Sequence, residues 1–296
     1  PGLKLVGSGA NSIEYNWTKR FMEIFADSDK VMNYFSLHYY CGASGHPTEF
    51  STDEWYQLLS QANGIEYCLK RHWNYICGFG MERYAKLAID EWGSWHPGGS
   101  GPSKGYNLFE QQNTMRDAMI AALTLNIFNN NCDKVEIGAI AQLVNCLQSL
   151  FLSAGTNLIT TPTYHVFDMY KGHQGGEALR VAVDKNEDIT FKNPNNGRES
   201  HLSKLSYSAS IKDGKLTLTV ANLSADTSEV LHLEPVGIKL SGSAQFGILT
   251  HTDYHAHNTF ENPENVKAVY KTVDISDGAI SVPAASIITV TADIVG

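Results

Sequence analysis

The stretch Leu87-Ala88-Ile89-Asp90-Glu91-Trp92-Gly93 decides the fold, because an apolar run ends there in two acids and an aromatic residue. The residues from Lys86 to Ile89 predict a β-strand, and the glycine-rich residues from Gly93 to Gly105 predict a long loop after it. In barrels of parallel strands, the carboxyl ends of the strands carry the catalytic side chains. Taken alone, the two acids fit a strand end at the surface slightly better than an active site.

A second strand, predicted from Tyr34 to Tyr40, also runs from apolar residues into polar aromatic ones. His38 and Tyr40 stand near its carboxyl end. A hydrogen-bonded core histidine and a packed tyrosine are the alternative interpretations. A functional role for either residue requires that both lie at the same edge of the barrel as Glu91.

Residues 1–172 alternate short apolar runs with helical patterns, which is typical of βα units. The remaining strands predicted in this part are Leu3–Val6 and Ile137–Val144. The predicted helices are Ser12–Phe25, Thr52–Gln61, Thr114–Phe128 and Thr163–Tyr170. In the first of them, apolar residues recur every three or four positions, at Ile13, Trp17, Phe21 and Ile24. In the third, Thr114 and Asp117 approximate a capping box at the start of a strongly amphipathic helix.

Residues 173–296 have a different character, because period-two alternation replaces the helical periodicity. Apolar and polar residues alternate from Leu205 to Ile211 and from Leu216 to Val220, on either side of a predicted tight turn at Asp213-Gly214. Further strands are predicted at Val230–Leu233, Phe246–Leu249 and Ser286–Ile294. This pattern predicts a jelly-roll β-sandwich, with the domain boundary near residues 172–180.

The predicted fold class is therefore α/β plus all-β, in two domains at residues 1–172 and 173–296. Roughly four βα units make only half of an eight-fold barrel, and the open edges of half a barrel are not stable alone. Pro1-Gly2 leads almost directly into the predicted strand Leu3–Val6, without an initiating methionine. We therefore expect a processed or partial piece of a longer protein, with the other half of the barrel supplied by upstream sequence.

Charge and hydropathy argue against two classes of partner. The formal net charge is −9 and no basic run is visible, which argues against nucleic-acid binding and against docking on anionic lipid. No run of about 18 apolar residues predicts a membrane-spanning helix. No signal-peptide pattern stands at the start, and localisation stays open because a signal would lie upstream.

Three other patterns give no support to a metal or cofactor site. The five cysteines, Cys41, Cys68, Cys77, Cys132 and Cys146, form no Cys-x-x-Cys pair, and we expect reduced, mostly buried thiols. His251, His255 and His257 cluster without a fixed ligand spacing, so no metal is expected. Gly7-Ser8-Gly9 lacks the third glycine of a dinucleotide-binding loop, which favours a plain turn.

Five motifs, in chain order, resemble those of glycoside hydrolase family 51, the α-L-arabinofuranosidases. The motifs are Ser36-Leu37-His38-Tyr39-Tyr40, Ile89-Asp90-Glu91-Trp92, Ala141-Gln142-Leu143-Val144-Asn145, His173-Gln174-Gly175-Gly176 and His257-Asn258-Thr259-Phe260-Glu261-Asn262-Pro263. Each motif is moderately specific, and the series extends over nearly the whole chain.

The resemblance implies a (β/α)₈ barrel followed by a jelly-roll sandwich, in a retaining enzyme with Glu91 as its nucleophile. It implies that Tyr40 orients this carboxylate, that Gln142 contacts the arabinose hydroxyls and that Trp95 shapes the sugar pocket. His38 is a further candidate for substrate binding. The implied substrates are terminal, non-reducing α-L-arabinofuranosyl groups of arabinan- or arabinoxylan-type oligosaccharides. The resemblance also implies a homo-oligomer.

A retaining glycosidase needs a second carboxyl group about 5–5.5 Å from its nucleophile. The resemblance places this acid/base glutamate after an asparagine upstream of residue 1, and Asn186-Glu187 in the sandwich region is no substitute. Asp90 is a poor candidate too, because adjacent strand residues point to opposite faces. Two alternatives stay open: a related glycosidase such as an endoglucanase or xylosidase, and a non-catalytic carbohydrate-binding or assembly subunit.

Overall fold

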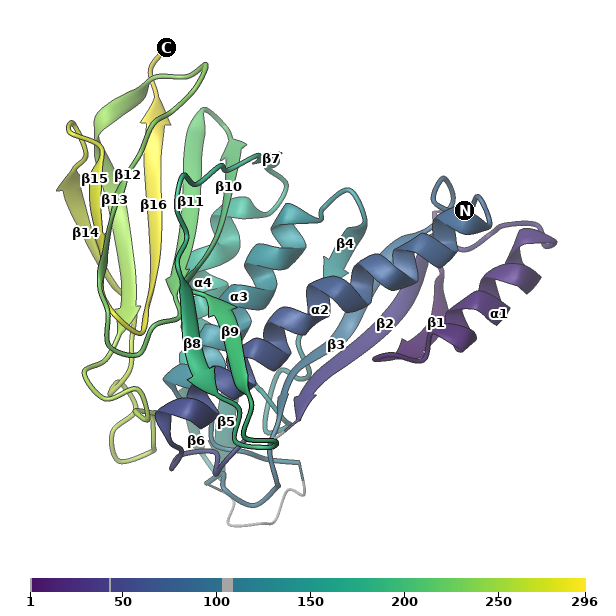
Figure 1. Cartoon of the computed structure of the whole chain (residues 1–296), viewed down its shortest axis with the longest axis horizontal. Helices are drawn as coiled ribbons and strands as arrows, with labels where there is room; N and C mark the ends of the chain where they lie inside the picture. The colour runs from purple at the N-terminus through teal and green to yellow at the C-terminus, as the bar shows by residue number, and fades with distance from the viewer. Residues whose placement is uncertain (1, 43, 103–108) are drawn as a thin grey trace.

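The structure is a computed structural model that describes residues 2–42, 44–102 and 109–296. A parallel sheet with its helices and an antiparallel sheet make up most of it (Figure 1). The parallel sheet has the strand order β1-β2-β3-β4. Its strands are β1 (Val6–Asn11), β2 (Tyr34–Gly42), β3 (Lys86–Trp95) and β4 (Val135–Gly138). The helices are α1 (Tyr15–Ala26), α2 (Thr52–Gly78), α3 (Met115–Asn130) and α4 (Pro162–Tyr170), followed by the short 3-10 helix η1 (Lys171–His173).

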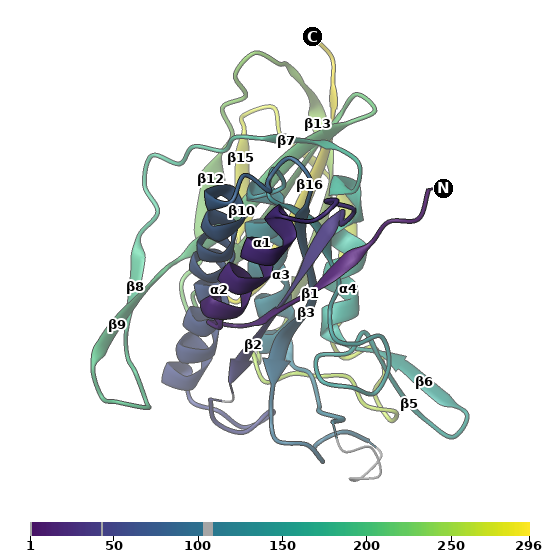
Figure 2. The same ribbon diagram turned by 90° about the vertical axis from the view of Figure 1, so that its right-hand side faces the viewer.

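The antiparallel sheet has the strand order β14-β13-β16-β11-β10-β7. Its strands are β7 (Glu177–Leu179), β10 (Leu205–Lys212), β11 (Lys215–Asn222), β13 (Leu240–Thr250), β14 (Val269–Asp274) and β16 (Ser286–Ile294). Three further strand pairs are β5 (Phe151–Ala154) with β6 (Asn157–Thr160), β8 (Asp188–Lys192) with β9 (Glu199–Ser203), and β12 (Glu229–His232) with β15 (Ala279–Val282). The pairs β5–β6 and β8–β9 project on opposite sides of the molecule (Figure 2).

The predicted hairpin at Asp213-Gly214 is confirmed, since Lys212 pairs with Lys215 and both turn residues have positive φ angles of 50° and 72°. This is the backbone geometry of a two-residue turn that matches the twist of its strands. The predicted strand from Ser286 to Ile294 is confirmed as β16. Local turn chemistry and alternation were therefore enough to identify these elements.

Strand β1 differs from its prediction in position. It begins at Val6, where the predicted strand Leu3–Val6 ends, and it contains Gly7-Ser8-Gly9, for which a turn is the wrong prediction. A side chain at Gly9 would overlap the carbonyl oxygen of Ser36 on β2. The glycine is therefore needed for the close approach of two strands and not for a turn.

The apolar spacing in the first helix identifies the helix but not its buried side. Ile13, Trp17 and Ile24 are 70%, 52% and 60% exposed. Helix α1 instead buries Thr18, Met22 and Phe25. The periodicity is therefore real, but three of the four apolar residues that it marks face solvent, and Phe21 packs on the core against Phe35.

Helix α2 begins at Thr52 as predicted but continues to Gly78, well beyond the predicted end at Gln61. Its start is a capping box, in which the Ser51 side chain accepts from the backbone N–H of Glu54 and the Glu54 carboxylate accepts from the N–H of Ser51. No helix in the described ranges is both long enough and apolar enough to cross a membrane.

Helix α3 confirms one prediction and corrects another. The capping box is present. The Thr114 hydroxyl accepts a hydrogen bond from the backbone N–H of Arg116, and the Asp117 carboxylate accepts one from the backbone N–H of Thr114. The amphipathic pattern is wrong, because every residue of α3 is buried except Leu125, Asn129 and Asn130. The reason is its place between the two sheets, where both of its sides are covered (Figure 1).

The contact of α3 with the antiparallel sheet is polar at its centre. The side-chain oxygen of Asn126 accepts hydrogen bonds from the hydroxyls of Ser208 on β10 and Thr219 on β11, both at 2.8 Å. All three residues are fully buried. The alternation of apolar and polar residues in β10 and β11 therefore does not mark a buried face and a solvent-exposed face, because the face with the hydroxyl side chains packs on helix α3.

His173 extends this polar contact, because its ring nitrogens lie 2.8 Å from the hydroxyl of Ser210 and 3.0 Å from that of Thr219. Burial lowers the pKa of His173 to about 4. Between pH 6.5 and 4, the unfolded chain therefore binds a proton at this residue that the folded chain does not. Stability is expected to fall as the pH drops through this window and to change no further at this residue below it.

A His173→Gln variant is expected to remove this part of the pH dependence. The loss of unfolding free energy between pH 7.5 and pH 4 should shrink by roughly 2 kcal/mol relative to the wild type. Urea unfolding at a series of pH values measures the difference. His201→Gln, at an exposed ring, is the control, and an unchanged pH dependence in His173→Gln would contradict the assignment.

Candidate active site

Glu91 and Tyr40 meet at the carboxyl end of the parallel sheet. Strands β2 and β3 are parallel neighbours, with His38 opposite Glu91 and Tyr40 opposite Gly93. The hydroxyl of Tyr40 donates a hydrogen bond of 2.9 Å to Oε2 of Glu91. The Glu91 side chain is 40% exposed, so it is held by the sheet and still open to a ligand.

Burial and the hydrogen bond to Glu91 both raise the pKa of Tyr40 far above its usual value. The phenol therefore stays protonated across the physiological pH range and acts as a donor. A donor at this position favours the ionised form of the carboxylate that it contacts. The pair can thus supply an oriented carboxylate with one oxygen engaged.

Asp90 was expected to point to the face opposite Glu91, and the structure corrects this expectation. The register between β2 and β3 shifts between Ser36 and His38, where one intervening residue of β2 faces two of β3. Such a bulge interrupts the alternation of side chains. As a result His38 lies 3.4 Å from Oδ1 of Asp90 and 3.4 Å from Oε2 of Glu91.

Strand β3 also continues farther than predicted. It extends to Trp95, so the predicted loop begins later than Gly93, and the part of that loop at residues 103–108 lies outside the described residues. The ring of Trp95 lies 5.0 Å from that of Tyr40, edge to face, and 5.6 Å from that of Phe109. Trp95 is 42% exposed and lies against Tyr40, the residue that hydrogen-bonds Glu91.

Gln142 lies at the same end of the sheet, in an exposed loop after β4. The segment starts beside β3, where the backbone N–H of Ala141 lies 3.5 Å from the carbonyl oxygen of Trp92. The backbone N–H of Gln142 donates to the carbonyl oxygen of Cys146. The predicted strand Ile137–Val144 is therefore wrong in extent, because β4 ends at Gly138. The structure thus joins Glu91, Tyr40, His38 and Trp95 by direct contacts, and it places Gln142 in a loop that starts beside Trp92 of β3.

A buried polar network supports the end of β3. Oδ1 of Asp117 accepts hydrogen bonds from the hydroxyl of Ser94 at 2.5 Å and from Nε2 of His96 at 3.2 Å. The Gln148 side chain accepts from the backbone N–H of Ser94 and donates to the carbonyl oxygen of Asp117. The network connects β3, α3 and the loop that contains Gln142, so it fixes the elements that carry the candidate residues.

Asp117 is fully buried, and its surroundings still favour the charged carboxylate. Burial alone would raise the pKa of Asp117, but the hydrogen bond and charge of His96, the charge of Arg116 and the Ser94 hydroxyl together lower it. From the sequence, Asp117 was predicted only as part of a helix cap. No local pattern indicated that Ser94, His96 and Gln148 would meet it, because their contacts join distant segments.

The cysteines differ in burial, and one histidine of the predicted cluster already has partners within the chain. Cys41 and Cys68 are buried, whereas Cys77 and Cys132 are exposed and Cys146 is intermediate, so the expectation of mostly buried thiols is wrong. The ring of His255 is already engaged by Asp253 and by the carbonyl oxygen of Phe50. Among the described residues, no group of three or more His, Cys, Asp or Glu side chains could hold a metal ion.

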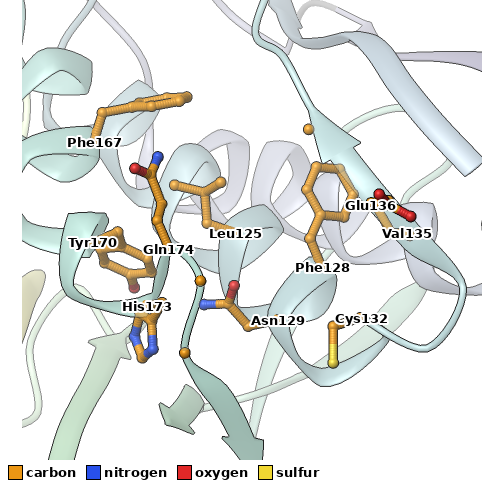
Figure 3. A pocket seen from close by; sticks show the side chains of 13 residues that line it. Leu125, Phe128, Asn129, Cys132, Val135, Glu136, Phe167, Tyr170, His173 and Gln174 are labelled. Carbon is orange, nitrogen blue, oxygen red and sulfur yellow. The ribbon is translucent and has the colours of Figure 1, made fainter. Parts of the chain in front are cut away.

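A cleft of about 360 Å³ lies elsewhere, between α3 and β4 on one side and the segment after α4 on the other (Figure 3). Phe128, Glu136, Phe167 and His173 are among its lining residues. None of the predicted site residues lines it. The Glu91 cluster is therefore the candidate site on chemical grounds, and this cleft is not part of it.

Comparison with known proteins agrees with the motifs. A family model described as "Alpha-L-arabinofuranosidase C-terminal domain" matches residues 90–286. An intracellular exo-alpha-L-arabinofuranosidase of Bacteroides ovatus is 33% identical over 293 residues, which cover 96% of this chain and 55% of that protein.

Two solved structures extend the comparison to the fold. A GH51 arabinofuranosidase from Xanthomonas axonopodis pv. citri is 27% identical with a TM-score of 0.85, over 99% of this chain and 59% of the other. An alpha-L-arabinofuranosidase from Thermotoga maritima, 21% identical, has the same fold with a TM-score of 0.77, over 99% of this chain and 58% of the other. The chain thus spans little more than half the length of these relatives. By the family model and the Bacteroides relative, the chain belongs to the α-L-arabinofuranosidases of glycoside hydrolase family 51, and it contains their C-terminal domain.

Proposed function

We propose that this chain is part of a retaining glycosidase that removes terminal, non-reducing α-L-arabinofuranosyl groups from arabinan- or arabinoxylan-type oligosaccharides. The observation that supports this most strongly is the Glu91 carboxylate in the carboxyl-terminal half of a parallel strand, with Oε2 held by Tyr40 at 2.9 Å. The printed name of the Bacteroides ovatus relative, an exo-alpha-L-arabinofuranosidase, supports the substrate class.

We propose that residues 1–172 are the second half of a (β/α)₈ barrel and that residues 173–296 are a jelly-roll sandwich. Four parallel strands in sequential order support the first assignment, and the six-stranded antiparallel sheet with the β12–β15 pair supports the second. In this arrangement the acid/base glutamate comes from a segment upstream of residue 1. The partners are then the N-terminal half of the same enzyme and further copies of it in a homo-oligomer.

The proposed reaction has two steps, each with a balanced proton transfer. In the first, Glu91 attacks C1 of the arabinofuranosyl group, the bond from C1 to the leaving oxygen breaks, and the acid/base residue protonates that oxygen. In the second, the acid/base residue takes a proton from water, which attacks C1 and releases Glu91. Two inversions at C1 give net retention.

The remaining site residues have proposed roles in binding. Trp95, beside Tyr40 and 42% exposed, would form an apolar wall for the sugar ring. Gln142, exposed at the same end of the sheet, would bind sugar hydroxyls through its amide. His38, whose Nδ1 lies 3.4 Å from Oε2 of Glu91, is a further candidate for contact with the substrate.

A panel of aryl glycosides tests the function in the complete enzyme. We expect hydrolysis of an aryl α-L-arabinofuranoside, with the first-formed arabinose in the α configuration by NMR. Preferred turnover of an aryl β-D-xyloside or β-D-glucoside would instead support the related-glycosidase alternative. Sugar binding without turnover of any member would support the non-catalytic one.

Changing Tyr40→Phe is expected to lower kcat on the arabinofuranoside by about 10- to 100-fold. The change removes one hydrogen bond to a charged oxygen, an interaction of roughly 1.5–3 kcal/mol. The matched control is Tyr34→Phe, whose hydroxyl donates at 3.0 Å to Glu136 on the same sheet. Equal turnover in the two variants would show that the Tyr40 hydroxyl has no role in catalysis.

A further inference from the structure

The ring of His38 lies between two carboxylates. Its Nε2 is 3.4 Å from Oδ1 of Asp90, and its Nδ1 is 3.4 Å from Oε2 of Glu91. The same Oδ1 of Asp90 accepts a hydrogen bond of 2.7 Å from the hydroxyl of Ser36. Asp90 is thus fixed from one side and faces the histidine on the other.

The strand around Ser36 is rigid enough to fix this geometry. Ser36 is 6% exposed, and its neighbours Phe35 and Leu37 are fully buried. The side chains of His38 and Asp90 are 34% and 39% exposed, and the His38 ring lies 3.4 Å from both Asp90 and Glu91. The bulge in β3 creates this arrangement, since regular alternation would direct Asp90 away.

An imidazole ring can turn over, and its neighbours decide which nitrogen faces which group. Each carboxylate faces one ring nitrogen, so a proton on either nitrogen is attracted to the carboxylate that it faces. In either form, a carboxylate at Nε2 keeps the ring in the orientation that directs Nδ1 to Glu91. Tyr40 donates to the same oxygen, Oε2, at 2.9 Å.

From these contacts we infer that Asp90 is a positioning residue, which acts on the nucleophile through His38. Asp90 holds the ring, the ring and Tyr40 together restrain Oε2 of Glu91, and Oε1 is the oxygen that attacks C1. The inference rests on the proposed function and adds to it a role for the acid next to the nucleophile.

A double-mutant cycle with Asp90→Asn and His38→Asn in the complete enzyme tests the inference. Asp90→Asn alone is expected to lower kcat on the aryl α-L-arabinofuranoside about tenfold, with KM unchanged, since one charge-assisted contact is weakened. In the His38→Asn background, the same change should alter kcat less than about twofold, because the two residues act as one unit. Ser36→Ala should lower kcat in the same direction by a smaller factor.

Glu136→Gln is the matched control, since it removes another carboxylate from the same sheet at the opposite end. It should leave kcat unchanged, and the urea midpoints of all variants should agree. Equal effects of Asp90→Asn in the two backgrounds would overturn the inference. A rise in KM with kcat unchanged would also overturn it, because Asp90 would then bind the substrate directly. Failure of the wild type to hydrolyse any arabinofuranoside would instead remove the proposed function.

Discussion

Changing Glu91→Ala is expected to lower kcat on an aryl α-L-arabinofuranoside at least about a thousandfold. The variant loses the oxygen that forms the bond to C1, while Tyr40 and His38 lose the group that they orient. Among the described residues, the neighbouring carboxylate of Asp90 does not replace that of Glu91, because a hydrogen bond of 2.7 Å from the Ser36 hydroxyl holds Asp90 in its own place. Steady-state kinetics in the complete enzyme measures the loss.

Two further measurements make this result specific to a nucleophile. Azide is small enough to enter the space that the carboxylate leaves, so it should restore release of the aryl group and give a β-configured glycosyl azide. Glu136→Ala, which removes a carboxylate with a similar tyrosine partner, should keep wild-type turnover. Turnover of Glu91→Ala within tenfold of the wild type would exclude Glu91 as the nucleophile.

Changing Asp117→Ala is expected to lower the free energy of unfolding by about 3–5 kcal/mol, the usual loss when one member of a buried ionic network is removed. The hydroxyl of Ser94, the ring of His96 and the N–H of Thr114 all lose their acceptor in a region without solvent access. The helix also loses half of its capping box.

Urea unfolding measures this loss through the midpoint and the slope of the transition. The control is Asp133→Asn, at a side chain that is 68% exposed, which should change stability by less than about 0.5 kcal/mol. A loss below about 1 kcal/mol for Asp117→Ala would show that the network does not depend on the Asp117 carboxylate. The end of β3 would then be held by Gln148 and Gln111, which hydrogen-bond the backbone of Ser94 and His96.

The predictions that succeeded rest on short-range chemistry. The capping box at Thr114 and Asp117 involves residues three apart, and the hairpin at Asp213-Gly214 needs only two residues that tolerate positive φ. The strands that carry Tyr40 and Glu91 were recognisable from their apolar residues, although both extend farther than predicted, to Gly42 and Trp95. In each case the cause of the structure lies within a few residues of it.

The predictions that failed concern which side of an element is covered. Helix α3 was predicted to be amphipathic, but two sheets enclose it. Three of the four apolar residues that mark the first predicted helix face solvent. Gly7-Ser8-Gly9 reads as a turn, yet Gly9 is small because Ser36 on another strand approaches it. These outcomes depend on partners that lie far away in the sequence.

The sequence by itself determined the cap at Thr114 and Asp117, the turn at Asp213-Gly214, and the identity of Glu91, Tyr40 and His38 as residues to examine. Only the tertiary structure decided how they meet, because a register shift between β2 and β3 sets the direction of the side chains. That shift brought Asp90 to His38 instead of the opposite face. The pairing of two strands separated by a long helix fixes this register, and no pattern within either strand encodes it.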